Sequence, residues 1–235
     1  MYSNDWEDLI KDITWLLKPN DLVNIIGITN GHENFSPDVQ FKKTFPLLTR
    51  LLESSRITKV EINNEPFEVY GWTNKEGSSF GWLCKPAMDR QQINQKRNIL
   101  CVEHMLLLNF FGGITERWNE REESWLLNLH SALTFNEAKE GFSEWEAYIN
   151  DACNTEGLKP YISSSDYTAF AFEANGNITL YNKMDSSVIM LASDHCFEHI
   201  VPLKGYPEYT LYSINGCPDF VSWVEFVAKQ ELSRL

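Results

Sequence analysis

The chain has 235 residues, 43% of them hydrophobic and 13% aromatic, which is enough to bury a substantial core and excludes a wholly disordered chain. Its 20 basic and 33 acidic side chains give a net charge of −13, and this sign argues against nucleic acid or an anionic membrane as a partner. No stretch approaches the roughly 18 uninterrupted apolar residues of a membrane span. The opening MYSNDWEDLI lacks the basic start of a signal peptide, so we expect a cytoplasmic protein.

The negative charge is concentrated in the C-terminal part of the chain. Residues 1–98 carry 12 Lys and Arg against 13 Asp and Glu, whereas residues 99–235 carry 8 against 20. A field of this sign would attract a basic partner, although acidity also serves solubility. The charge shift near residue 98 is the one candidate boundary in the chain. A predicted helix crosses it, which favours a continuous unit.

The first part of the chain predicts two helices and a small meander. Apolar residues at helical spacing predict a helix of about 12 to 14 residues that ends at Pro19-Asn20. A second helix is predicted over 37–53, with a kink or a broken start at Pro46. The apolar period then changes to two, which predicts three short strands over 57–62, 67–72 and 79–84.

The middle of the chain predicts a long helix over 89–110 that ends at Gly112-Gly113. A glycine beyond the last turn can adopt the left-handed conformation that closes a helix. Residues 114–158 give weaker signals, namely a short strand at 125–129 and a helix at 143–153. The rest of the chain predicts strands at 168–174, 177–182, 187–191 and 209–214 and a last helix at 218–232.

The stretch FAFEANGNITLYN, residues 170–182, predicts a β-hairpin. Asn175-Gly176 lies between two alternating apolar runs, and both central residues of a type I′ turn need a positive φ angle. A two-residue loop would pair Phe172 with Thr179. Both faces of the hairpin carry apolar side chains, so we expect helices to cover much of each.

Two groups of side chains could carry catalytic chemistry. The segment SDHCFEHI holds five potential metal ligands, although zinc sites usually draw ligands from several segments and a strand would hold the two histidines ~13 Å apart. These ligands are Asp194, His195, Cys196, Glu198 and His199. A Cys–His nucleophilic pair could come from Cys101 or Cys196 with His104, His130 or His195. The five cysteines form no CxxC pair, so we expect reduced thiols, and no nucleotide-binding or hydrolase motif predicts a cofactor.

The order of these parts resembles the SUKH superfamily. The resemblance rests on the helix and glycine pair HMLLLNFFGG, the Asn-Gly hairpin, and the strand and helix YTLYSINGCPDFVSWVEFVAKQ. It covers roughly residues 95–232. It implies an α+β fold, with a twisted, mainly antiparallel sheet flanked by helices. We expect one domain over 1–235, in which residues 1–94 form a helix-plus-strand extension of a SUKH-like core over 95–235.

The resemblance also implies a non-enzymatic protein-binding scaffold without a cofactor. SUKH proteins are chiefly bacterial immunity proteins that neutralise cognate toxins, many of them nucleases, and a fungal regulator of cell-wall synthesis shares the fold. Under this interpretation Gly112, Gly113, Asn175 and Gly176 are structural. Two alternatives stay open, a regulatory scaffold with several partners and a thiol or metal hydrolase that uses Cys196, His195 and His199.

An acidic protein can cover the basic surface of a nuclease toxin, which makes a basic protein the expected partner. Trp118 lies among charged residues in TERWNEREESW, where it would be either a half-exposed anchor for a partner or a lid over the sheet. We predict a partner-binding face that includes Glu116, Trp118, Glu120, Glu122, Glu123, Glu140, Glu144 and Glu146.

Overall fold

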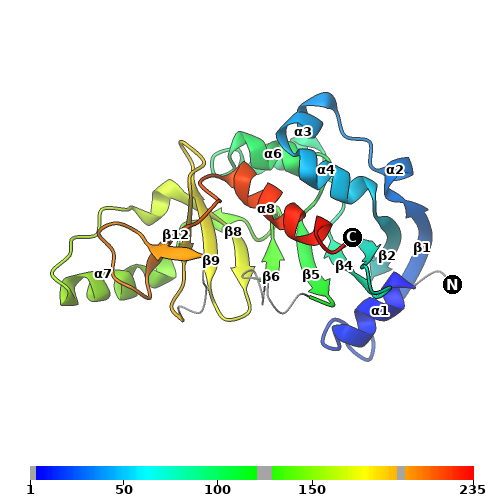
Figure 1. Cartoon of the computed structure of the whole chain (residues 1–235), viewed down its shortest axis with the longest axis horizontal. Helices are drawn as coiled ribbons and strands as arrows, with labels where there is room; N and C mark the ends of the chain where they lie inside the picture. Colours follow the sequence, from blue (N-terminus) through cyan, green and yellow to red (C-terminus); the bar gives the residue numbers. More distant parts are fainter. Residues whose placement is uncertain (1–3, 121–128, 195–198) are drawn as a thin grey trace.

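One sheet of twelve strands forms the frame of the computed structural model, which describes residues 4–120, 129–194 and 199–235 (Figure 1). The strands are β1 (Val23–Asn30), β2 (Arg56–Ile62), β3 (Glu65–Thr73), β4 (Ser79–Cys84), β5 (Ile114–Trp118), β6 (Leu129–Ala132), β7 (Lys139–Glu140), β8 (Tyr167–Glu173), β9 (Ile178–Asn182), β10 (Val188–Leu191), β11 (Ile200–Pro202) and β12 (Leu211–Ile214). Their order is β1-β2-β3-β4-β5-β6-β8-β9-β10-β12-β11, and β7 pairs with β8. The strands pair antiparallel, which confirms the predicted α+β class with a mainly antiparallel sheet.

Helices cover both faces of this sheet. They are α1 (Asp5–Asp12), α2 (Gly31–Asn34), α3 (Val39–Thr44), α4 (Pro46–Glu53), α5 (Arg90–Ile93), α6 (Val102–Leu108), α7 (Glu146–Thr155) and α8 (Phe220–Leu232). Helices α3, α4, α6 and α8 contribute to one large core on one face, whereas α1 and α7 pack against separate clusters (Figure 1). Within the described part of the chain, no helix combines the length and apolar character needed to cross a membrane.

The large core is rich in aromatic rings and draws on both halves of the chain. Phe170 on β8 packs edge-on against Phe220 and Trp223 of α8, with ring centroids 5.2 and 4.9 Å apart. Phe45, just before α4, packs against Phe220 at 6.5 Å. Residues 1–94 therefore share both the sheet and the main core with the rest of the chain.

Several predicted elements of the N-terminal part are present, with differences in extent. The first helix ends at Asp12, earlier than predicted, although Ile13 belongs to the same buried cluster as Trp6 and Leu9 of the helix. The predicted break at Pro46 is confirmed, because α3 ends at Thr44 and α4 starts at the proline. The three predicted strands of the meander are β2, β3 and β4. Strand β1 was not predicted.

The prediction of one long helix over 89–110 is wrong. Helix α5 ends at Ile93, and α6 starts only after Cys101, whose backbone is extended. A 3-10 turn over Asn94–Lys96 follows α5, and side chains of the sheet bind the backbone at the end of the stretch before α6. The Cys101 N–H donates to the Tyr181 hydroxyl at 3.1 Å, and the Thr168 hydroxyl donates to the Ile99 carbonyl. The hydroxyl groups in these bonds belong to strands β8 and β9, which are distant in the sequence, so the apolar spacing within residues 89–110 gives no sign of them.

The hairpin at 170–182 is present, but its predicted turn type and register are wrong. The Gly176 N–H donates to the Glu173 carbonyl at 3.0 Å, which leaves a three-residue loop in which Gly176, at φ +93°, has the left-handed conformation. Asn175 does not share that conformation. Phe172 therefore lies opposite Ile178 instead of Thr179. Such a loop is a type I turn followed by a left-handed glycine.

The predictions for residues 114–158 are confirmed in part, and those for the later strands and the last helix are confirmed. The predicted helix at 143–153 is confirmed as a short 3-10 turn followed by α7. The predicted strand at 125–129 lies almost entirely outside the described residues, and β6 begins at Leu129. The four later strands are confirmed as β8, β9, β10 and β12, and the last helix as α8, whose cap is Asp219.

Candidate functional site

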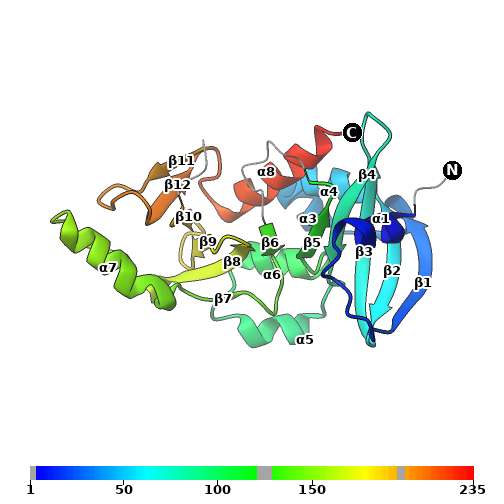
Figure 2. The same cartoon turned by 90° about the horizontal axis from the view of Figure 1, so that it is seen from below.

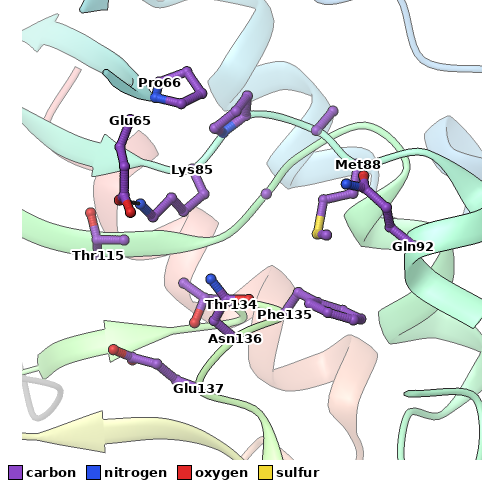
Figure 3. A pocket seen from close by; sticks show the side chains of 13 residues that line it. Glu65, Pro66, Lys85, Met88, Gln92, Thr115, Thr134, Phe135, Asn136 and Glu137 are labelled. Atoms are coloured by element: carbon purple, nitrogen blue, oxygen red, sulfur yellow. Dashed lines mark hydrogen bonds and ion pairs between the residues drawn. The ribbon is translucent and has the colours of Figure 1, made fainter. Parts of the chain in front are cut away.

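A pocket of about 400 Å³ lies between the β3–β4 side of the sheet and the loop 133–138 that follows β6 (Figure 3). Its wall combines apolar residues with several polar and charged side chains. The lining residues are Glu65, Pro66, Lys85, Pro86, Ala87, Met88, Gln92, Gly112, Thr115, Thr134, Phe135, Asn136 and Glu137. The charged groups among them are two carboxylates, Glu65 and Glu137, and the ammonium of Lys85.

The loop 133–138 is held in place by a lysine from the other side of the pocket. The Lys96 ammonium donates to the carbonyls of Phe135, Asn136 and Ala138 at 2.5, 3.1 and 2.7 Å. Burial lowers the pKa of Lys96. Three carbonyls around one ammonium use all of its donors, so the loop is fixed by contacts from the chain segment that precedes α6.

A buried histidine fixes the start of the same loop. His104 on α6 lies within hydrogen-bond distance of the Leu133 carbonyl through Nε2, at 3.0 Å, and of the Tyr181 hydroxyl through Nδ1, at 3.2 Å. A carbonyl can only accept, so Nε2 carries the proton and the Tyr181 hydroxyl donates to Nδ1. Burial lowers the pKa of His104 to about 4, which keeps the imidazole neutral. Leu133 needs this support because its backbone is left-handed, with φ at +66°.

The glycine pair lies at the pocket, and Gly112 is part of its lining. A Cβ on Gly112 would lie 2.1 Å from the Pro86 carbonyl oxygen, and a Cβ on Gly113 would lie 2.5 Å from the Leu133 backbone. Gly113 also has φ at +88°. The predicted structural role of this pair thus corresponds to a close approach of three backbone segments at the pocket.

The polar lining is largely paired within the protein. Lys85 forms an ion pair with Glu65 at 2.9 Å (Figure 3) and lies 3.7 Å from the centre of the Phe67 ring. The Glu137 carboxylate accepts from the Ser131 hydroxyl. The Thr134 hydroxyl is buried and has no hydrogen-bond partner among the described residues. A buried unpaired hydroxyl is unfavourable, so Thr134 is the lining group with most to gain from a bound molecule.

Exposed acidic side chains are frequent along the chain from the pocket to the end of α7. We call the exposed acidic side chains of the segment 137–156 the acidic surface. They are Glu137, Glu140, Glu144, Glu146, Asp151 and Glu156. Two lysines pair with members of this set, Lys139 with Glu144 at 3.5 Å and Lys183 with Glu140. The acidic surface therefore keeps an excess of negative charge.

Aromatic side chains lie beside the acidic surface. Tyr148 on α7 is exposed, and its hydroxyl donates to the Tyr209 carbonyl at 2.9 Å. The Tyr148 ring stacks edge-on with Trp145 at 5.8 Å, and Tyr209 is also exposed. Exposed tyrosines beside acidic groups suit the long side chains of lysine and arginine, because a ring face attracts a cation. Sequence reasoning missed these tyrosines.

The predicted partner-binding residues do not form one face. Trp118 is 2% exposed and Glu116 is 8% exposed, so the prediction of a half-exposed tryptophan anchor is wrong. Trp118 lies on β5 opposite Gly81, and a Cβ on Gly81 would lie 2.3 Å from the Trp118 ring. The missing side chain at that position makes room for the indole under α1. Glu116 accepts a hydrogen bond from the Trp15 indole at 3.3 Å.

The other predicted acidic residues divide into three groups. Glu120 is half-buried and forms an ion pair with Arg117 at 3.0 Å. Glu122 and Glu123 lie outside the described residues. The remaining three belong to the acidic surface, and they are Glu140, Glu144 and Glu146.

The candidate catalytic groups differ in burial: Cys101 and His104 are buried, Asp194 is half-buried and His199 is exposed. Burial raises the pKa of the Cys101 thiol to about 11. The predicted partner of Cys101 is His104, whose Nδ1 already accepts a hydrogen bond from the Tyr181 hydroxyl. The pair therefore lacks an ionisable thiol and a free base. His195, Cys196 and Glu198 are not among the described residues. Within the described part of the chain, no group of three or more His, Cys, Asp and Glu side chains is placed to hold a metal ion.

We expect Glu173→Gln to stabilise the protein at alkaline pH. Burial raises the pKa of Glu173, at the hairpin, to about 8, although a hydrogen bond from Asn177 opposes this shift. The folded state then binds more protons than the unfolded state between about pH 4.5 and 8, so its stability falls as the pH rises through that window. Removing this ionisation should add up to about 5 kcal/mol at pH 9 and little at pH 4.

Urea unfolding of the wild type and Glu173→Gln at pH 4, 7 and 9 measures this difference. The exposed Glu76→Gln is the control, and its effect should be small at every pH. A gain from Glu173→Gln that is the same at every pH would show that the carboxyl group does not ionise within the folded protein in this range.

The described site thus combines a pocket, a loop fixed by buried groups and an adjacent acidic surface with exposed tyrosines. Comparisons of the chain with models of protein families, with characterised proteins and with solved structures find no match.

Proposed function

We propose that this chain is a non-enzymatic protein-binding module that binds a basic protein through the acidic surface and the adjacent pocket. The observation that carries the proposal is the excess of exposed acidic residues in segment 137–156, together with the exposed Tyr148 and Tyr209. Complementary charge speeds the encounter with a basic partner, and tyrosine supplies contact area at low entropic cost. The resemblance to SUKH immunity proteins supports the same proposal, with a toxin as the partner.

The pocket adds a place for a side chain of that partner. Glu137 belongs both to the pocket lining and to the acidic surface, so a cationic side chain can enter with its charged end near a carboxylate. The Phe135 ring and Met88 supply apolar contacts for its aliphatic part. The loop that carries Phe135 is already fixed by Lys96, which limits the entropy lost on binding.

We expect charge reversal of the acidic surface to abolish capture of the partner. The test variant carries Glu140, Glu144 and Glu146, each changed to Lys. The control variant carries Glu7, Glu33 and Glu76, each changed to Lys, so both variants change the charge by the same amount. Glu7 matches Glu146 because both lie in the first turn of a helix. All six carboxylates are exposed.

The measurement is affinity capture from a lysate of the native cell at low and moderate salt, followed by mass spectrometry. The wild type and the control should retain one stoichiometric basic protein, less of it at moderate salt, and the test variant should retain at least ten times less. Equal retention by all three proteins, or no stoichiometric partner at either salt, contradicts the proposal. Several partners in place of one would favour the regulatory scaffold.

A further inference from the structure

Strand β1 is an open edge of the sheet. Among the described residues it pairs with β2 alone, and Figure 2 shows it at the end of the molecule, away from α7. Its apolar side chains are exposed, with Ile25 at 47% and Ile28 at 64%. An exposed apolar edge strand offers unpaired backbone groups to another strand. Most proteins protect such an edge, so its exposure here needs an explanation.

Strand β1 has neither of the two common sequence devices that protect an edge. The stretch LVNIIGITN, residues 22–30, contains no charged residue and no proline. A bulge between Ile25 and Gly27 is its one irregularity. The opposite edge of the sheet is different, because β11 has three residues and ends at Pro202. Strand β1 has eight residues, so β11 of another copy is too short to pair along its whole length.

One face of β1 continues an apolar layer that α1 leaves uncovered. Val23 and Ile25 lie opposite Ile62 and Val60, and directly opposed residues share a face of the sheet. Ile62 and Val60 belong to the cluster that packs under α1. Helix α1 contacts β3, β4 and β5, so the layer ends at β1 without a cover (Figure 2).

We infer that β1 pairs antiparallel with β1 of a second copy of this chain, about a two-fold axis through the middle of the strand. The mate must be an unpaired, uncharged strand of similar length, and β1 itself meets that description. Like charges do not meet in this pairing. The acidic charge lies in residues 99–235, and α7 lies at the opposite end of the long axis, so the dimer keeps the acidic surfaces apart. The short β11 edge prevents growth into a filament.

The dimer has a distinctive dependence on salt. Each copy carries a net charge of −13, so the two copies repel each other and added salt weakens that repulsion. Dimerisation through an uncharged strand should therefore become stronger as salt rises. Binding of a basic protein to the acidic surface should become weaker, so the two interactions are distinguished by the sign of the salt effect.

The test is sedimentation of the wild-type chain over a range of concentrations, at low and moderate salt, together with two variants. Ile25→Lys puts one charged side chain from each copy into the apolar strand pair and should raise the dimer dissociation constant at least tenfold. Val201→Lys is the matched control, since Val201 is also 47% exposed but lies on the edge strand β11. Amide hydrogen exchange of residues 23–30 should slow as the wild-type concentration rises.

A dimer that Ile25→Lys weakens and Val201→Lys leaves unchanged, with protection in β1, supports the inference. A wild-type chain that stays monomeric at every concentration overturns it. A dimer that weakens with Val201→Lys, or that leaves exchange in β1 unchanged, also overturns it.

Discussion

Gly113→Ala should lower the free energy of unfolding by about 3 kcal/mol or more, which is a large share of the stability of an ordinary domain. Two separate effects add at this residue. A left-handed backbone, with φ at +88°, is strained for alanine by about 1 kcal/mol. The new Cβ would also lie 2.5 to 2.6 Å from the backbone of Leu133 and Thr134, which cannot move away as a side chain can.

Two other glycines separate these effects. Gly112 has no positive φ, but its Cβ would lie 2.1 Å from a backbone oxygen, so Gly112→Ala tests close packing alone. Gly176 has φ at +93° and open space around it, so Gly176→Ala tests backbone strain alone and should cost about 1 kcal/mol. Urea unfolding gives all three values.

The order of the three losses decides the interpretation. Gly113→Ala should be the most destabilising, and Gly176→Ala the least. If Gly113→Ala costs no more than Gly176→Ala, the close contact between the glycine pair and the loop 133–138 does not exist in solution.

His104→Ala should destabilise the protein by about 3 to 5 kcal/mol. The substitution removes a fully buried ring and leaves the Leu133 carbonyl and the Tyr181 hydroxyl without the partner that they share. It also leaves a cavity beside Phe220, whose ring stacks on the imidazole at 5.0 Å. The pocket loop then loses one of its two anchors.

The same histidine should make the protein sensitive to acid. Burial lowers the pKa of His104 from 6.5 to about 4, so the unfolded chain binds a proton that the folded chain excludes in this window. The contribution of His104 is therefore complete above about pH 6.5 and is lost as the pH falls towards 4. The loss should amount to about 2 to 3 kcal/mol.

Unfolding in urea at pH 7, 5.5 and 4.5 measures this loss. His104→Gln removes the titrating group, so its destabilisation relative to the wild type should shrink as the pH falls. The exposed His32→Gln is the control, and its effect should be small at every pH. A destabilisation by His104→Gln that is constant between pH 7 and 4.5 would show that the histidine titrates alike in both states.

Much of the fold could be predicted from sequence because its signals are local. The alternation in 57–84 led to the meander β2–β4, and the apolar spacing after Pro218 led to α8, which buries Phe220 and Trp223. Pro46 marked the break between α3 and α4 because proline restricts both itself and the preceding residue. Less of the site was predictable. The glycine pair and three acidic residues of the acidic surface were found, and the pocket was not.

Periodicity and charge are properties of neighbouring residues, so the class of the fold, the order of most elements and the segregation of acidic charge could be predicted from the chain alone. The start of α6, the burial of Trp118 and the pocket could not. In each case the deciding group is distant in the chain. Tyr181 binds the Cys101 backbone from 80 residues away, and Gly81 makes room for Trp118 across β4 and β5. Contacts of this kind depend on packing, which no local pattern contains.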